Sequence, residues 1–271
     1  MITKKEISEF IDKIPPTPEI LKETLSLLNN GELTKAASVA ESDLALKSYL
    51  KSIVNNPIYG FRNEVNDISQ IFGILGVCRS QQTVHNYMIN LLSPKEWLLF
   101  NLTENTFLEL QAHLSTKWEK ILQHLSDEGK VSINDKDVLN AISLLPSSII
   151  VTEALFSTHI KNVKLLKETK ALDYNTILLR LCGITLFDIC EEIAKKWDMH
   201  EIIPKILQAS SGINQPEDEK INQLGKWMHL LLFYELSQPQ LVKAGLNDFI
   251  DFHVDYVEDI YEEFISMMEI S

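Results

Sequence analysis

The sequence predicts an all-α protein. Apolar residues recur at helical spacing along most of the 271 residues, and helix-start and helix-stop residues bound these stripes. Every candidate strand is short and lacks a flanking hairpin turn. With 45% hydrophobic and 23% charged residues, the chain can bury a sizeable core. We therefore expect one large helical domain or two helical lobes.

The first of these helices is predicted to start at Thr17-Pro18. Thr17 is a suitable N-cap, and Pro18 fits the first helical position, where a missing N–H costs nothing. Apolar residues continue to Leu28, and Asn29-Asn30-Gly31 is a stop signal.

Two more starts follow in the next fifty residues. Asp43 is a cap for a helix that breaks at Asn55-Asn56-Pro57. Asp67 with Gln70 three residues later predicts a capping box, and Gly76 suits the left-handed residue that follows a helix end.

The rest of the chain is also expected to be helical. Ser93-Pro94 repeats the start signal, polar residues with glycine or proline predict two loops, and the last helix has an acidic face with no Lys or Arg after Lys243. The expected segments are a helix over about 96–125, a loop at 127–135, an apolar helix over 137–156, a loop at 212–219 and a final helix over about 246–270.

Composition excludes several classes of function. A net charge of -13 repels nucleic acid and anionic membrane surfaces. There is no leader-like start, and we expect no stretch near the roughly 18 apolar residues that cross a bilayer. Cys78, Cys182 and Cys190 have no CxxC spacing, so reduced, mostly buried thiols are expected. These features predict a cytoplasmic protein.

Four segments in order carry a family resemblance. They are Ile14-Pro15-Pro16-Thr17-Pro18, Asp43-Leu44-Ala45-Leu46, Asn55-Asn56-Pro57-Ile58-Tyr59-Gly60 and Ile68-Ser69-Gln70-Ile71-Phe72-Gly73-Ile74-Leu75-Gly76. This series resembles the HDOD domain, a helical bacterial signal-transduction module, although Leu44 replaces the proline usual there. The resemblance implies an HDOD helical bundle over residues 1–95 and a degenerate HD-like helical lobe over 96–212. Residues 213–271 form a C-terminal helical extension beyond it.

HDOD domains are similar to HD-superfamily phosphohydrolases, which hold a divalent metal through His and Asp ligands. The resemblance aligns Pro146 and Ser147 with the His-Asp ligand pair, and Pro146 has no ligand atom. Gln208-Ala209-Ser210-Ser211 stands where relatives often place paired histidines, and His113 is the candidate remnant of a first ligand. We therefore expect no metal, no cofactor and no enzymatic activity.

The turn after residue 54 has two interpretations. Its amide, aromatic and Arg side chains either cap and pack the turn itself or contact a partner. These interaction candidates are Asn55, Asn56, Tyr59 and Arg62.

Three functions follow as hypotheses. The first is a regulatory protein-interaction scaffold for signalling partners. The second is a sensor that binds a nucleotide or similar small molecule in the degenerate HD cleft without turnover, for which a cleft lined by Arg62, Arg79 or Arg180 would be evidence. The third is a metal-dependent phosphohydrolase with unrecognised ligands.

Overall fold

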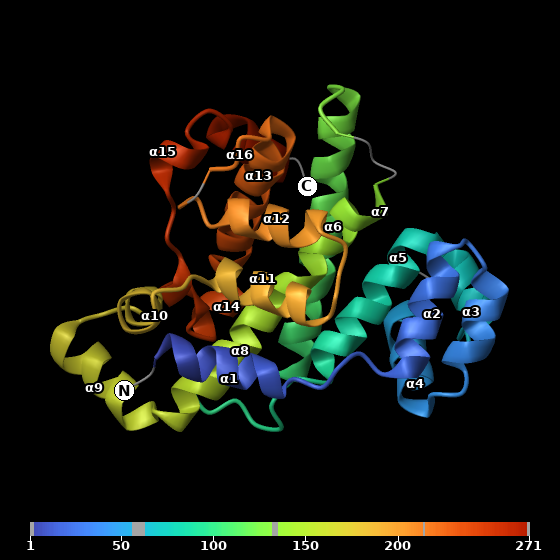
Figure 1. Cartoon of the computed structure of the whole chain (residues 1–271), viewed down its shortest axis with the longest axis horizontal. Helices are drawn as coiled ribbons and strands as arrows, with labels where there is room; N and C mark the ends of the chain where they lie inside the picture. Colours follow the sequence, from blue (N-terminus) through green and yellow to red (C-terminus); the bar gives the residue numbers. More distant parts are fainter. Residues whose placement is uncertain (1–2, 56–62, 132–134, 214, 270–271) are drawn as a thin grey trace. The chain divides into compact units, whose positions relative to one another are not determined.

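The computed structural model describes residues 3–55, 63–131, 135–213 and 215–269, and within these ranges all regular structure is helical (Figure 1). This confirms the all-α prediction. The chain forms two compact units: Pro15–Leu91, and Met1–Ile14 together with Leu92–Ser271. The division differs from the three expected ranges, because the first residues and the C-terminal extension both belong to the larger unit.

The smaller unit is a bundle in which three helices pack against a fourth, α5. Its apolar stripes meet in a core that includes Leu21, Leu28, Leu46, Leu50, Ile71 and Phe72. The helices are α2 (Glu19–Asn29), α3 (Leu33–Ala40), α4 (Leu44–Val54) and α5 (Ile68–Asn90).

Asp43 and Asp67 are N-caps as predicted, but at Asp67 the Gln70 side-chain bond that would complete the predicted capping box is not formed. The Asp43 carboxylate accepts the Ala45 N–H at 2.9 Å, and the Asp67 carboxylate accepts the Gln70 N–H at 2.7 Å. The Thr17 prediction is wrong, because Pro18 has a non-helical ψ of 142° and is itself the N-cap, without a side-chain bond.

Gly76 interrupts α5 with φ 71° and ψ 177°. Glycine alone adopts this region readily, because a Cβ would clash with the local backbone. The predicted break at Gly76 is therefore confirmed, but the chain re-enters a helix at once instead of continuing into a loop.

The larger unit contains the remaining helices, with α8 against α11, α11 against α12, α12 against α13 and α13 against α6. Their bounds are α1 (Lys4–Lys13), α6 (Glu104–Asp127), α7 (Lys136–Ala141), η2 (Ile142–Leu144), α8 (Leu145–Thr158), α9 (Ile160–Lys170), α10 (Tyr174–Cys182), α11 (Leu186–Lys196), α12 (Ile202–Ser210), α13 (Glu219–Leu236), α14 (Pro239–Lys243), η3 (Leu246–Phe249), α15 (Val254–Val257) and α16 (Tyr261–Glu269).

The helix start predicted at Ser93 is wrong. Residues 92–103 are not helical, and α6 begins after Thr103. The reason is the buried Glu153 of α8, whose carboxylate accepts the N–H groups of Leu98 at 2.7 Å, Leu99 at 3.1 Å and Phe100 at 3.1 Å. Three successive backbone donors thus bond to one buried carboxylate, and the segment curves around it instead of forming a helix.

The single long helix predicted at the C-terminus is also wrong. The segment divides into η3, α15 and α16, with Ile250 in extended conformation at ψ 117°. This break lets Phe249 pack on Phe100 at 5.6 Å between ring centroids, and it lets the His253 N–H reach the His229 ring at 3.2 Å.

One segment, Lys136–Thr158, is apolar and long enough to cross a membrane, contrary to the expectation that no such stretch exists. In the structure it comprises α7, η2 and α8, and 94% of its most apolar window is buried inside the protein. The segment therefore belongs to the core of the larger unit.

Candidate functional site

Helix α6 has a polar face beside its buried stripe. Thr103 caps the helix by accepting the Thr106 N–H at 3.1 Å. Thr106, Glu109, His113 and Lys117 follow at intervals of three or four residues, so they share one face. This face is turned toward α13, which packs against α6.

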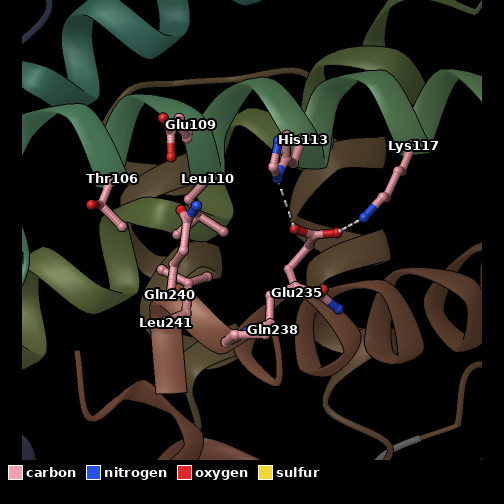
Figure 2. Close-up of a pocket in the computed structure, with 10 residues that line it drawn as sticks. Thr106, Glu109, Leu110, His113, Lys117, Glu235, Gln238, Gln240 and Leu241 are labelled. Carbon is pink, nitrogen blue, oxygen red and sulfur yellow. Dashed lines mark hydrogen bonds and ion pairs between the residues drawn. The ribbon is translucent and has the colours of Figure 1, made fainter. Parts of the chain in front are cut away.

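Helix α13 brings a buried acid to that face. The side chain of Glu235, near the C-terminal end of α13, is 1% exposed. Its Oε1 pairs with Lys117 Nζ, and its Oε2 lies 3.5 Å from His113 Nδ1 (Figure 2). That second distance is too long for a strong hydrogen bond, so Oε2 is a buried oxygen without a close donor among the described residues.

The surroundings keep this carboxyl ionised. Burial by itself would raise the pKa of Glu235, but the Lys117 ammonium and the facing His113 ring outweigh burial and leave the pKa below its ordinary value. The Lys117 ammonium also lies 4.7 Å from the centre of the Tyr234 ring, a cation–π contact that fixes its position.

These groups line a pocket of about 240 Å³ between α6 and the turn from α13 into α14 (Figure 2). Its polar groups include two carboxylates, one ammonium, one imidazole and two amides, which suits a small ligand with hydrogen-bond donors. The lining residues are Thr106, Glu109, Leu110, His113, Lys117, Glu235, Gln238, Pro239, Gln240 and Leu241.

His113 is therefore paired across to α13. Pro146 and Ser147 lie in α8, where both are buried. The Ser147 hydroxyl donates to the Leu144 carbonyl at 2.5 Å, a bond within the preceding turn. Among the described residues, His113 thus faces Glu235, whereas the Ser147 hydroxyl contacts the Leu144 carbonyl and, at 4.0 Å, the Cys190 sulfur.

Two other side chains near Pro146 that could act as nucleophiles, Ser148 and Cys190, are buried and hydrogen-bonded. The Ser148 hydroxyl donates to the Leu145 carbonyl at 2.7 Å. The Cys190 thiol donates to the Leu144 carbonyl at 3.3 Å, and burial raises the pKa of this thiol to about 12. A thiol that stays protonated is a poor nucleophile and a poor metal ligand.

Of the four interaction candidates, Asn56, Tyr59 and Arg62 lie outside the described residues. Asn55 ends α4, and its side-chain N–H groups donate to the carbonyls of Lys51 at 2.9 Å and Val65 at 3.0 Å. Its side-chain oxygen accepts the Val65 N–H at 2.7 Å. The Asn55 side chain thus bonds the backbone at Lys51 and Val65, which agrees for this one residue with the capping interpretation.

Lys117 and Glu235 were not among the site residues predicted from the sequence. Glu235 could have been found from its position at the end of the apolar run Leu230–Tyr234, where an acid is buried together with the apolar face of the helix. Neither Arg79 nor Arg180 lines the pocket, and Arg62 is outside the described residues. The arginine-lined cleft expected for a nucleotide sensor is therefore not the pocket that these helices form.

Comparison with known proteins gives one matching family model and three similar solved structures. The model of the HDOD domain matches residues 14–211. An HDOD domain protein of unknown function from Geobacter sulfurreducens has a TM-score of 0.61 at 13% identity, with 97% of this chain and 94% of that chain covered. The chain matches no curated protein sequence.

Two further solved structures are more distant. A protein from Shewanella amazonensis, described provisionally as a metal-dependent phosphohydrolase, has a TM-score of 0.49 at 13% identity, covering 94% of this chain and 92% of that one. A virulence factor from Campylobacter jejuni has a TM-score of 0.41 at 15% identity, covering 97% and 100%. The Geobacter likeness supports the shared helical fold, and the other two carry no argument about activity.

Proposed function

The chain belongs to the HDOD domain family, and from this premise we propose that it is a non-enzymatic regulatory protein of the bacterial cytoplasm that acts by binding partner proteins. One observation carries the proposal. The two positions that the family resemblance aligns with the metal-binding pair hold a buried proline, Pro146, and a buried serine, Ser147, whose hydroxyl donates to the Leu144 carbonyl.

This donor set does not fit a catalytic divalent metal. Such an ion needs several convergent imidazole and carboxylate ligands that hold it and activate a water molecule. Pro146 offers no donor atom, and the Ser147 hydroxyl is committed to the Leu144 carbonyl. His113, the candidate remnant, is paired with Glu235 from outside the family match. We derive no hydrolytic step for these residues.

The net charge of -13 bears on the partner. An acidic surface disfavours nucleic acid and anionic lipid and favours a protein with a basic contact surface. The turn residues Tyr59 and Arg62 remain the proposed contact site, since an aromatic and an Arg are typical anchors of interfaces.

Affinity capture from the source cells, followed by titration of the purified candidate, tests the proposal. We expect a stoichiometric complex that persists in EDTA and that weakens at least about tenfold in the double variant Tyr59→Ala/Arg62→Ala. Arg180→Ala is the matched control, since Arg180 is an exposed arginine of the larger unit. Failure to capture any partner above background, together with a tight small-molecule ligand, would contradict the proposal.

The pocket favours a second candidate function, sensing of a small molecule without turnover. Its supporting observation is Glu235 Oε2, a buried oxygen of an ionised carboxylate without a close donor. A ligand ammonium or hydroxyl group would supply that donor. Thermal-shift screening with amines, polyols and cyclic dinucleotides tests this function, since a ligand that binds the folded state raises the melting temperature. Shifts that persist in Glu235→Gln would exclude the pocket as the binding site.

A further inference from the structure

We propose that His124, Glu128 and Glu263 form a structural binding site for a divalent transition-metal cation, with Zn²⁺ as the probe. The nitrogen of His124 and one oxygen of each glutamate all lie within 4.8 Å of one another. Ligand atoms around one zinc ion lie about 2.0–2.2 Å from it, hence up to about 4 Å apart. Small side-chain rotations would bring the three atoms onto one ion.

The backbone places these groups from two elements. His124 and Glu128 are four residues apart at the end of α6, so they face the same side, and their Nε2 and Oε2 atoms are 3.8 Å apart. Glu263 comes from α16, which packs against α13, and its Oε1 contacts the same His124 Nε2. A single ring nitrogen thus faces both carboxylates.

The His124 ring is oriented by packing. Its centroid lies 5.7 Å from the ring of Trp227, a fully buried residue of α13. Phe264, next to Glu263, packs on the same Trp227 ring at 5.9 Å. One aromatic side chain therefore supports both halves of the site, and such support fixes the orientation of a ligating imidazole.

The chemistry of the donor set selects the kind of ion. One imidazole and two carboxylates are ligands that Zn²⁺ accepts, with water completing a four-coordinate shell. Two carboxylates would also neutralise the ion, and α15 and α16 contain further acids and no Lys or Arg, although Lys130 lies at Glu128. Local negative potential of this kind concentrates cations.

The ammonium group of Lys130 competes with a metal ion for the Glu128 carboxylate. Its Nζ lies 2.7 Å from Glu128 Oε2, so an arriving cation must displace the ammonium from that carboxylate. Removal of the ammonium should therefore strengthen metal binding. A simple ion-pair cluster would show the opposite, a loss of stability without any gain in metal affinity.

A bound ion would join the family domain to the extension. His124 and Glu128 fall within the matched residues 14–211, whereas Glu263 follows them. The ion would hold α16 against the end of α6 and would leave Pro146 and Ser147 untouched. This inference is independent of the partner-binding proposal, since cation binding without hydrolysis is compatible with either outcome there.

The test is calorimetric titration of the EDTA-treated full chain with Zn²⁺, together with thermal melts at increasing Zn²⁺. We expect one equivalent to bind, with a melting temperature that rises with Zn²⁺ by mass action. Glu263→Gln should weaken binding at least about tenfold, whereas Glu262→Gln, the same charge change at an exposed neighbour, should leave it unchanged. Lys130→Met should bind more tightly than the unmodified chain.

Equal Zn²⁺ affinities in Glu263→Gln and Glu262→Gln would overturn the proposal, as would an absence of saturable binding in the unmodified chain. If Glu263→Gln folds poorly, His124→Gln provides the same comparison, since it removes the ring nitrogen and retains a polar side chain of similar size.

Discussion

At the scale of the residue, two backbone groups determine the protonation state of the buried His229. Its Nδ1 lies 2.8 Å from the Ser210 carbonyl, which accepts a hydrogen bond and cannot donate one. Its Nε2 lies 3.2 Å from the His253 N–H, which donates. The ring must therefore carry its proton on Nδ1 and be neutral. The tautomer depends on residues 19 and 24 positions away, so the sequence around His229 does not reveal it.

Stability should fall in acid because of His229. Burial lowers its pKa from 6.5 to about 4, so between these values the unfolded chain binds a proton that the folded chain does not. The contribution is fully present above about pH 6.5 and is lost toward pH 4, by on the order of 3 kcal/mol.

Urea unfolding of the unmodified chain and His229→Gln at pH 7 and pH 5 measures this loss. The difference in unfolding free energy between the two proteins should shrink toward pH 5. His85 has a pKa lowered to about 4 by burial, but it contributes equally to both proteins. A difference that does not change with pH would contradict the assignment.

Lys117 should be a large contributor to stability. Lys117→Met leaves the buried Glu235 carboxylate without its cation, at a cost of about 3–5 kcal/mol. Lys120→Met, at an exposed position on the same helix, is the control and should change little. The double variant Lys117→Met/Glu235→Gln should recover most of the loss in chemical denaturation. Similar stabilities of Lys117→Met and Lys120→Met would show that the pair contributes nothing.

At the scale of the element, local signals predicted helix starts well where the cap acts within its own turn. Asp43 and Asp67 are such cases. The prediction of a helix start at Ser93 was wrong because the Glu153 carboxylate, more than fifty positions later, accepts hydrogen bonds from the N–H groups of that segment. The prediction of one long last helix was wrong because the segment breaks where the His253 N–H donates to His229, 24 positions earlier. The apolar periodicity of a segment indicates which face is buried, but it does not indicate hydrogen bonds to residues far away in the sequence.

Gly76 provides a test at this scale. Gly76→Ala should cost about 1–3 kcal/mol, because alanine disfavours φ 71° with ψ 177°. No neighbouring atom would meet the new Cβ, so the cost is one of backbone conformation. Gly73→Ala in the helical part of α5 also meets no atom and should be neutral or stabilising by up to about 1 kcal/mol. Thermal or urea unfolding of both variants measures the contrast, and equal effects would contradict the strained break.

At the scale of the whole molecule, the family could be read from four short signatures, all between residues 14 and 76. The pocket could not be predicted from short sequence signatures. Lys117 and Glu235 are separated by 118 positions, and Glu235 lies outside the matched residues 14–211. The unit that contains them also joins the first residues of the chain to the last helices, an arrangement set by packing that no local pattern encodes.

The central claim is that this HDOD domain protein binds and does not hydrolyse, because Pro146 and Ser147 offer no metal-ligand pair. The most direct test is phosphodiesterase turnover of the purified full chain with Mn²⁺, Fe²⁺ or Zn²⁺, on an aryl phosphodiester and on cyclic dinucleotides. We predict rates equal to those of the metal ions alone, in the unmodified chain and in Ser147→Ala. Turnover that EDTA abolishes and that the unmodified chain shows above the metal control would contradict the account.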